Sequence, residues 1–73
     1  MPHIKLKMYP GVTEDQKKEL AMALTEQVMK FTGKPEMAIS VDIVEVPEEN
    51  WMKEVYNTEI KPNMDTLYQK PGY

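Results

Sequence analysis

Two segments in which polar and apolar residues alternate flank one long helical pattern, and this order constrains the fold of the 73-residue chain most strongly. In the first segment, Ile4, Leu6 and Met8 occupy every second position, as expected for a β-strand with one buried face. Residues 38–46 form the second predicted strand, in which Ser40 is one of the polar residues. A strand, a helix and a second strand predict a βαβ unit with parallel strands and a right-handed crossover.

The intervening helix is predicted over residues 14–32. Thr13 and Gln16 have the spacing of a capping box at its start, and Gly33 followed by Pro35 is typical of a helix end. Apolar side chains share one face of this helix, namely Leu20, Ala21, Leu24, Val28 and Phe31. We therefore expect this helix to cover one face of the sheet.

The C-terminal third of the chain is less regular. We predict that Trp51 is a turn residue and that residues 55–60 form an irregular or short β segment. A short C-terminal helix is expected over residues 62–70, because Pro62 suits the first turn of a helix. The predicted fold class is therefore α/β, or α+β, with two parallel strands, one long helix and a short C-terminal helix.

A single domain of this size, residues 1–73, buries little apolar surface and usually needs a further source of stability. The chain contains no cysteine, so disulfides are excluded and a reducing, cytoplasmic environment is expected. A two-stranded sheet is also too small to be stable alone. We therefore expect a homodimer in which a second subunit completes a four-stranded sheet, while the polar face that carries Lys5, Lys7 and Asp42 stays in water.

Composition argues against several other classes of protein. The net charge of −3, from nine basic and twelve acidic residues, argues against a nucleic-acid partner. One histidine and no cysteine argue against a zinc site, and we expect neither a metal nor a cofactor. No signal peptide and no apolar run of membrane-spanning length is present. All nine basic residues are lysines, so an anion site must use lysine, a hydroxyl group or backbone N–H groups.

Pro2 is the candidate catalytic residue. An initiator methionine is normally removed before a small residue, and Pro2 would then carry a free secondary amine at the end of a rigid strand. No side chain provides such a group. Taken alone, Pro2 is better explained as the first residue of a strand, where a missing donor does no harm.

Three motifs occur in order along the chain: Met1-Pro2-His3-Ile4, then Pro47-Glu48 preceding Trp51, and finally Lys70-Pro71-Gly72-Tyr73. With the β–α–β order, they resemble the 4-oxalocrotonate tautomerase-like family of the tautomerase superfamily, and within it the dimeric PptA type. The resemblance covers nearly the whole chain. It implies a cofactor-independent isomerase in which Pro2 is the general acid and base of keto–enol tautomerisation and Trp51 is an apolar wall of the pocket. The residue type alone fits an anchor of a subunit contact equally well.

Two positions depart from the family pattern. Many members hold substrate carboxylates with two arginines, and the matching positions here are Val12 and Ser40. The resemblance therefore implies a substrate-binding position at Ser40, but a mono-acid with an apolar body, such as phenylpyruvate, rather than a dicarboxylate. His3, Lys5 and Lys7 are interpreted as solvated side chains on the polar face.

Two alternatives to this interpretation stay open. Relatives use the same proline in its protonated form for hydratase or dehalogenase chemistry, although they usually need positive groups that polarise the substrate. A non-catalytic oligomeric binding module would tolerate replacement of Pro2. Physical chemistry supports the interpretation as a tautomerase, because burial would lower the pKa of the Pro2 amine towards the working pH, where a general base is most effective. The group that compensates the enolate is left open among a lysine, a hydroxyl and backbone N–H groups.

Overall fold

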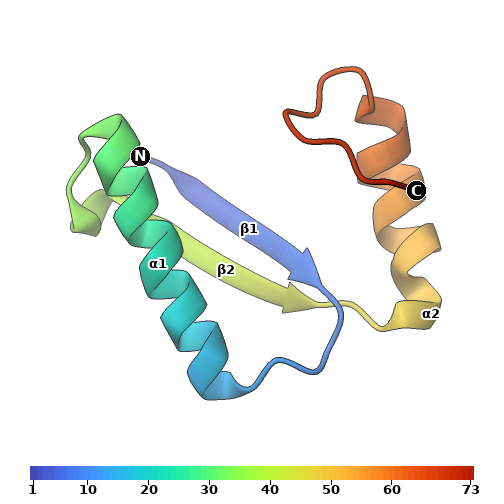
Figure 1. The fold of residues 1–73 in the computed structure, drawn as a ribbon, viewed down its shortest axis with the longest axis horizontal. Helices are drawn as coiled ribbons and strands as arrows, with labels where there is room; N and C mark the ends of the chain where they lie inside the picture. Colours follow the sequence, from blue (N-terminus) through green and yellow to red (C-terminus); the bar gives the residue numbers. More distant parts are fainter.

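The computed structural model describes residues 1–73, and its elements run strand, helix, strand, helix (Figure 1). Strand β1 spans His3–Met8, helix α1 spans Glu14–Thr32 and strand β2 spans Ser40–Glu45. A 3₁₀ turn, η1 (Glu36–Ala38), leads into β2. The two strands pair in parallel as a two-stranded sheet, which confirms the predicted βαβ unit and its fold class.

Helix α1 begins and ends as its sequence predicts. Thr13 Oγ1 accepts a 3.2 Å hydrogen bond from the N–H of Gln16, and the Gln16 side chain accepts a 3.0 Å bond from the N–H of Thr13. This reciprocal pair is the predicted capping box. At the other end, Gly33 takes a left-handed conformation, with φ of 72°, and its N–H bonds to the carbonyl of Met29.

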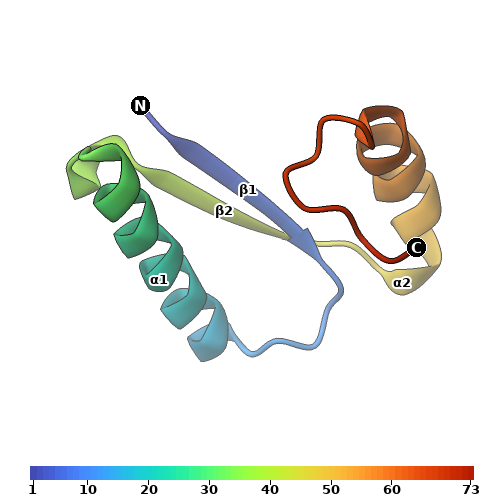
Figure 2. The ribbon, with the colours of Figure 1, turned by 45° about the horizontal axis from the view of Figure 1, so that its top comes forward.

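The register of the strands separates an apolar face from a polar face. Helix α1 lies along one side of the sheet in both views (Figures 1 and 2). Apolar side chains of both strands are half-buried, namely Ile4, Leu6, Val41 and Ile43. On the polar face, His3 lies beside Ser40 and Lys5 lies beside Asp42.

A helical arm follows β2 and comprises α2 (Glu48–Trp51), η2 (Met52–Ile60) and η3 (Lys61–Asn63). The backbone stays in the right-handed helical region at both junctions, so the three form one continuous helix. Within it, η2 has the wider π geometry, in which an N–H bonds to the carbonyl five residues earlier. Both views place this helical arm on the side of the strands away from α1 (Figures 1 and 2).

The helical arm corrects the expectations for the C-terminal third. Trp51 is helical rather than a turn residue, and residues 55–60 are helical rather than irregular or β. The helix expected over residues 62–70 is wrong, because the helical arm ends at Asn63 and only a turn over residues 64–66 follows. The physical reason is packing: Val55 is buried in the arm, and short helices gain most of their stability from such tertiary contacts.

A single chain of this protein buries very little surface. Only Val46 and Val55 are buried, with 6% and 5% of their surface exposed. Phe31 was expected on the apolar face of α1 but is 79% exposed, and its ring lies 5.4 Å from the Lys30 ammonium instead. The accessible surface of 5841 Å² exceeds the roughly 4,700 Å² typical of a folded monomer of this mass.

The overall dimensions agree with this open architecture. The radius of gyration is 13.9 Å, whereas a compact domain of this length has a radius near roughly 11 Å. The molecule measures 35 × 31 × 19 Å, and the helical arm accounts for its width beyond the sheet (Figure 1). None of its helices has both the length and the apolar character needed to cross a membrane.

Candidate active site

Pro2 and Ser40 lie together where the two strands begin. The N–H of Ser40 donates a 3.2 Å hydrogen bond to the carbonyl of Pro2, which ties Pro2 to the first residue of β2. Pro2 is half-buried, whereas Met1 before it is 96% exposed. The parallel pairing of β1 and β2 thus brings together two of the three predicted site residues.

His3 adds a polar side chain to this end of the sheet. Its Nδ1 lies 2.6 Å from Ser40 Oγ, so the imidazole and the hydroxyl share a hydrogen bond. Both residues are exposed. Because the hydroxyl rotates and the imidazole has two neutral tautomers, the pair can either donate to or accept from a ligand oxygen.

Trp51, the third predicted site residue, lies in an open groove of about 560 Å³ at the far end of β1. Seven residues line this groove: Lys7, Met8, Tyr9, Pro10, Val12, Trp51 and Tyr73. Its volume is within the range of about 300–1,000 Å³ that is usual for small-molecule sites. Lys7 has the one charged side chain in an otherwise apolar and aromatic lining.

Aromatic contacts hold the Trp51 wall of the groove in place. The rings of Tyr9 and Trp51 meet edge to face, with centroids 5.2 Å apart and planes at 89°. Trp51 Nε1 donates a 2.9 Å hydrogen bond to the Tyr73 hydroxyl, and the Tyr73 ring lies 5.5 Å from that of Tyr56. The tail after the helical arm therefore folds back onto it, and such aromatic pairs add stability beyond area burial.

Pro2 and Trp51 of the same chain do not lie side by side. Pro2 precedes β1, whereas the groove is lined by residues at and beyond the C-terminal end of that strand. At 3.3 Å per residue, the chain runs roughly 20 Å from Pro2 to Met8, which lines the groove with Trp51. The apolar wall that the sequence suggests for Pro2 is therefore missing within a single subunit.

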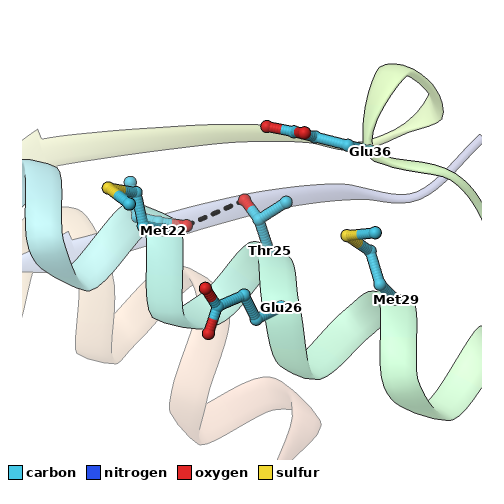
Figure 3. Close-up of a pocket in the computed structure, with 6 residues that line it drawn as sticks. Met22, Thr25, Glu26, Met29 and Glu36 are labelled. Atoms are coloured by element: carbon cyan, nitrogen blue, oxygen red, sulfur yellow. Dashed lines mark hydrogen bonds between the residues drawn. The ribbon is translucent and has the colours of Figure 1, made fainter.

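A second pocket of about 470 Å³ lies between α1 and η1 (Figure 3). Thr25 Oγ1 in this pocket donates its hydrogen bond to the backbone carbonyl of Ala21 at 2.8 Å. The charged residues of the lining are Glu26 and Glu36. Because both are acidic, this pocket disfavours organic acids, whereas the groove has a lysine that could bind one.

Three residues of these clusters were missed by sequence reasoning. His3 and Lys7 were interpreted as solvated because they alternate with buried residues, but His3 bonds to Ser40, and Lys7 lines the groove and pairs with Glu59. Tyr73 closes the Lys-Pro-Gly-Tyr motif, which carries the resemblance but gives no indication of its contact with Trp51. No three His, Cys, Asp or Glu side chains gather as a metal site would require.

The βαβ unit, the proline before its first strand and the apolar groove together define a small α/β protein with a site for a compact organic ligand. The family described as "Tautomerase enzyme" matches residues 2–56 of this chain. The chain belongs to this tautomerase family.

Relatives of full length support the assignment. "Tautomerase PptA" of Cronobacter sakazakii is 43% identical, with 100% of this chain and 97% of the relative aligned. "Tautomerase PptA" of Pectobacterium carotovorum subsp. carotovorum is 40% identical over the same shares. "Probable tautomerase" of Xylella fastidiosa is 37% identical, over 100% of this chain and 89% of the relative. The protein is therefore an isomerase of the tautomerase type.

Proposed function

We propose that the protein interconverts the enol and keto forms of small 2-oxo mono-acids with an apolar body, such as phenylpyruvate, without a cofactor. The observation that carries this substrate class is the groove, which is apolar and aromatic and has one charged side chain, that of a lysine. A planar aryl group fits against Trp51 and Tyr9, and a single cation suits a single carboxylate.

Pro2 is the catalytic acid and base in this proposal. After removal of Met1, its ring nitrogen is a secondary amine with a free lone pair. In ketonisation the nitrogen takes the proton of the enol hydroxyl and delivers a proton to the other carbon of the enol double bond, so the protons balance and no co-reactant is consumed. Hydrogen bonds to the developing enolate oxygen lower the barrier, and the Ser40–His3 pair beside Pro2 is one source of them.

A homodimer joins the two halves of the proposed site. The strand β1 has an open edge, because the sheet consists of β1 and β2 alone. If two copies of β1 pair in an antiparallel manner about a twofold axis, the start of one strand lies beside the end of the other. Pro2 of the partner subunit then reaches the groove that holds Trp51, and each dimer contains two composite sites.

The surface of the single chain favours this assembly. Only two residues are buried, and several large apolar side chains are exposed, among them Met22, Phe31, Met37 and Met52. The excess of accessible surface over a typical monomer is roughly 1,100–1,200 Å². This is within the range of about 1,000–2,500 Å² that each partner loses in an obligate homodimer. The open strand edge is also an unpaired template that native proteins usually cover.

The decay of phenylenolpyruvate absorbance tests the proposed reaction. Processed wild-type protein should accelerate ketonisation, and Pro2→Ala should lose at least about a hundredfold in kcat/KM, as expected for a general acid–base residue. Pro35→Ala is the matched control, because Pro35 caps η1 far along the chain and lines neither the groove nor the strand start. Full activity in Pro2→Ala would exclude Pro2 as the base, and hydration or dehalogenation without tautomerisation would favour the alternative chemistry.

A further inference from the structure

Lys7 differs in its surroundings from the other lysine of the polar face. Its side chain is 28% exposed, whereas that of Lys5 is 52% exposed and lies 4.0 Å from Asp42. Lys7 forms a direct ion pair with Glu59, a residue of η2 that is 52 positions away in the sequence. The helical arm therefore holds the ammonium group of Lys7 at the groove, and this contact does not exist for Lys5.

The lining of the groove makes this lysine the natural partner of an anion. The other six lining residues have uncharged side chains, and the chain contains no arginine. A charge beside apolar and aromatic side chains is less screened than one in water, so its attraction for a carboxylate is stronger. Glu59 satisfies Lys7 while the groove is empty, which avoids the cost of an unpaired and partly desolvated charge.

We infer that Lys7 anchors the carboxylate of an aryl acid in the groove and that Glu59 is its internal competitor. This inference rests on the proposed function, since it assigns the acid-binding residue of that site. The aryl group of the ligand lies against Trp51, and its carboxylate shares or displaces the Glu59 contact. A second carboxylate on the ligand meets the negative charge of Glu59, so the same pair that binds a mono-acid discriminates against a diacid.

Trp51 is the single tryptophan of the chain and lines the groove, so its fluorescence reports binding directly. Hydrocinnamate is a suitable probe, because it has the aryl group and the carboxylate but no oxo group to tautomerise. Hydrocinnamamide is its uncharged counterpart. Wild-type protein should bind the acid at least about tenfold more tightly than the amide, as expected for a charge-assisted contact.

Variants then assign this preference to one residue. Lys7→Met should bind acid and amide equally, Lys7→Arg should keep the preference for the acid, and Lys5→Met is the matched control that should leave it unchanged. Glu59→Gln should bind hydrocinnamate several-fold more tightly and lose much of the discrimination against benzylmalonate, a diacid, because the competing charge is gone.

Several results would overturn the inference. The first is equal binding of acid and amide by wild-type protein, a comparison that needs no variant to fold. The second is a preference that survives in Lys7→Met, and the third is a preference that disappears in Lys5→Met. The proposed function fails separately: hydrocinnamate binding that depends on Lys7, without any turnover of phenylenolpyruvate, would keep the anion site and exclude the tautomerase reaction.

Discussion

The indole N–H of Trp51 donates a 2.9 Å hydrogen bond to the hydroxyl of Tyr73, which joins residues 22 positions apart and fastens the tail to the helical arm. The Tyr73 ring also lies 5.5 Å from that of Tyr56, so the tail is held by two contacts. Tyr73 therefore fixes the orientation of the Trp51 ring and forms a wall of the groove itself.

Tyr73→Phe should loosen this wall while keeping the aromatic ring. Loss of one neutral hydrogen bond weakens such a contact by about 1 kcal/mol, which corresponds to a rise of roughly fivefold in KM for phenylenolpyruvate with little change in kcat. The Trp51 emission maximum should shift to longer wavelength as the indole gains water. Tyr68→Phe is the matched control, because Tyr68 is fully exposed. An identical response of both variants would show that Tyr73 does not hold the groove.

Val12 predicts a preference for mono-acids over diacids. It lines the groove as an apolar residue, at a position where the family resemblance suggests an arginine in many members. Each charge-assisted bond contributes about 1.5–3 kcal/mol, so phenylenolpyruvate should exceed a dicarboxylate enol clearly in kcat/KM. Val12→Arg should reduce the difference in kcat/KM between the two substrates, and Val12→Met should leave this difference unchanged. Comparable kcat/KM values for both substrates in the wild-type protein would contradict the assignment.

Lys17 links the first turns of α1 to the end of β2. Its ammonium donates a 2.8 Å hydrogen bond to Glu45 and lies 3.7 Å from Glu14. The hydrogen bond to Glu45 is the main reason why the pKa of Lys17 is raised above its ordinary value. Desolvation lowers this pKa in part, and the charges of Glu45 and Glu14 raise it further.

The raised pKa of Lys17 sets the pH range of its contribution to stability. A lysine whose pKa is higher in the folded state stabilises fully below its ordinary pKa of 10.5, and the contribution is lost as the pH rises through the folded-state value. The melting temperature of the wild type should therefore fall more than that of Lys17→Met between about pH 9 and 12. This interval extends about 1.5 pH units on either side of the ordinary pKa. Exposed Lys18→Met should behave as the wild type, and parallel pH curves for all three proteins would contradict the linkage.

A substitution at the open edge of β1 tests the proposed homodimer. The carbonyls of Pro2 and Met8 bond towards β2, so by alternation the peptide groups of Lys5 face the open edge. Lys5→Pro should remove an edge donor without touching the β1–β2 ladder, and should shift the protein from two chains of 8.5 kDa towards one in light scattering. Lys5→Met should stay dimeric. A stable wild-type monomer at micromolar concentration would remove the composite site, and a hexamer would mean that the polar face is buried.

The βαβ unit was predictable because its signals are local. Alternation identifies both strands, and the caps at Thr13 and Gly33 define the limits of α1 within the segment between them. The helical arm was not predictable in this way. Its residues match neither period clearly, and its helix depends on burial of Val55, a tertiary contact that no local pattern shows.

The site could be predicted only in part, for a related reason. The proximity of Pro2 and Ser40 follows from parallel pairing of two strand starts, which the sequence pattern implies. The place of Lys7 in the groove does not follow from this pattern, because alternation assigns Lys7 to the polar face. Only the folded helical arm brings Glu59 and Trp51 to it. Likewise, the sequence shows that Trp51 follows the second strand but not which end of β1 it covers.

The most direct test of Pro2 as the base compares the same chain with and without Met1. While Met1 is attached, the Pro2 nitrogen belongs to an amide, and its lone pair is delocalised into the carbonyl, so it cannot act as a base near neutral pH. Two preparations, distinguished by intact mass before and after methionine aminopeptidase treatment, are assayed for the decay of phenylenolpyruvate. We predict that the chain beginning at Pro2 is active and that the chain retaining Met1 is inactive. Equal turnover by the two preparations would show that Pro2 is not the base.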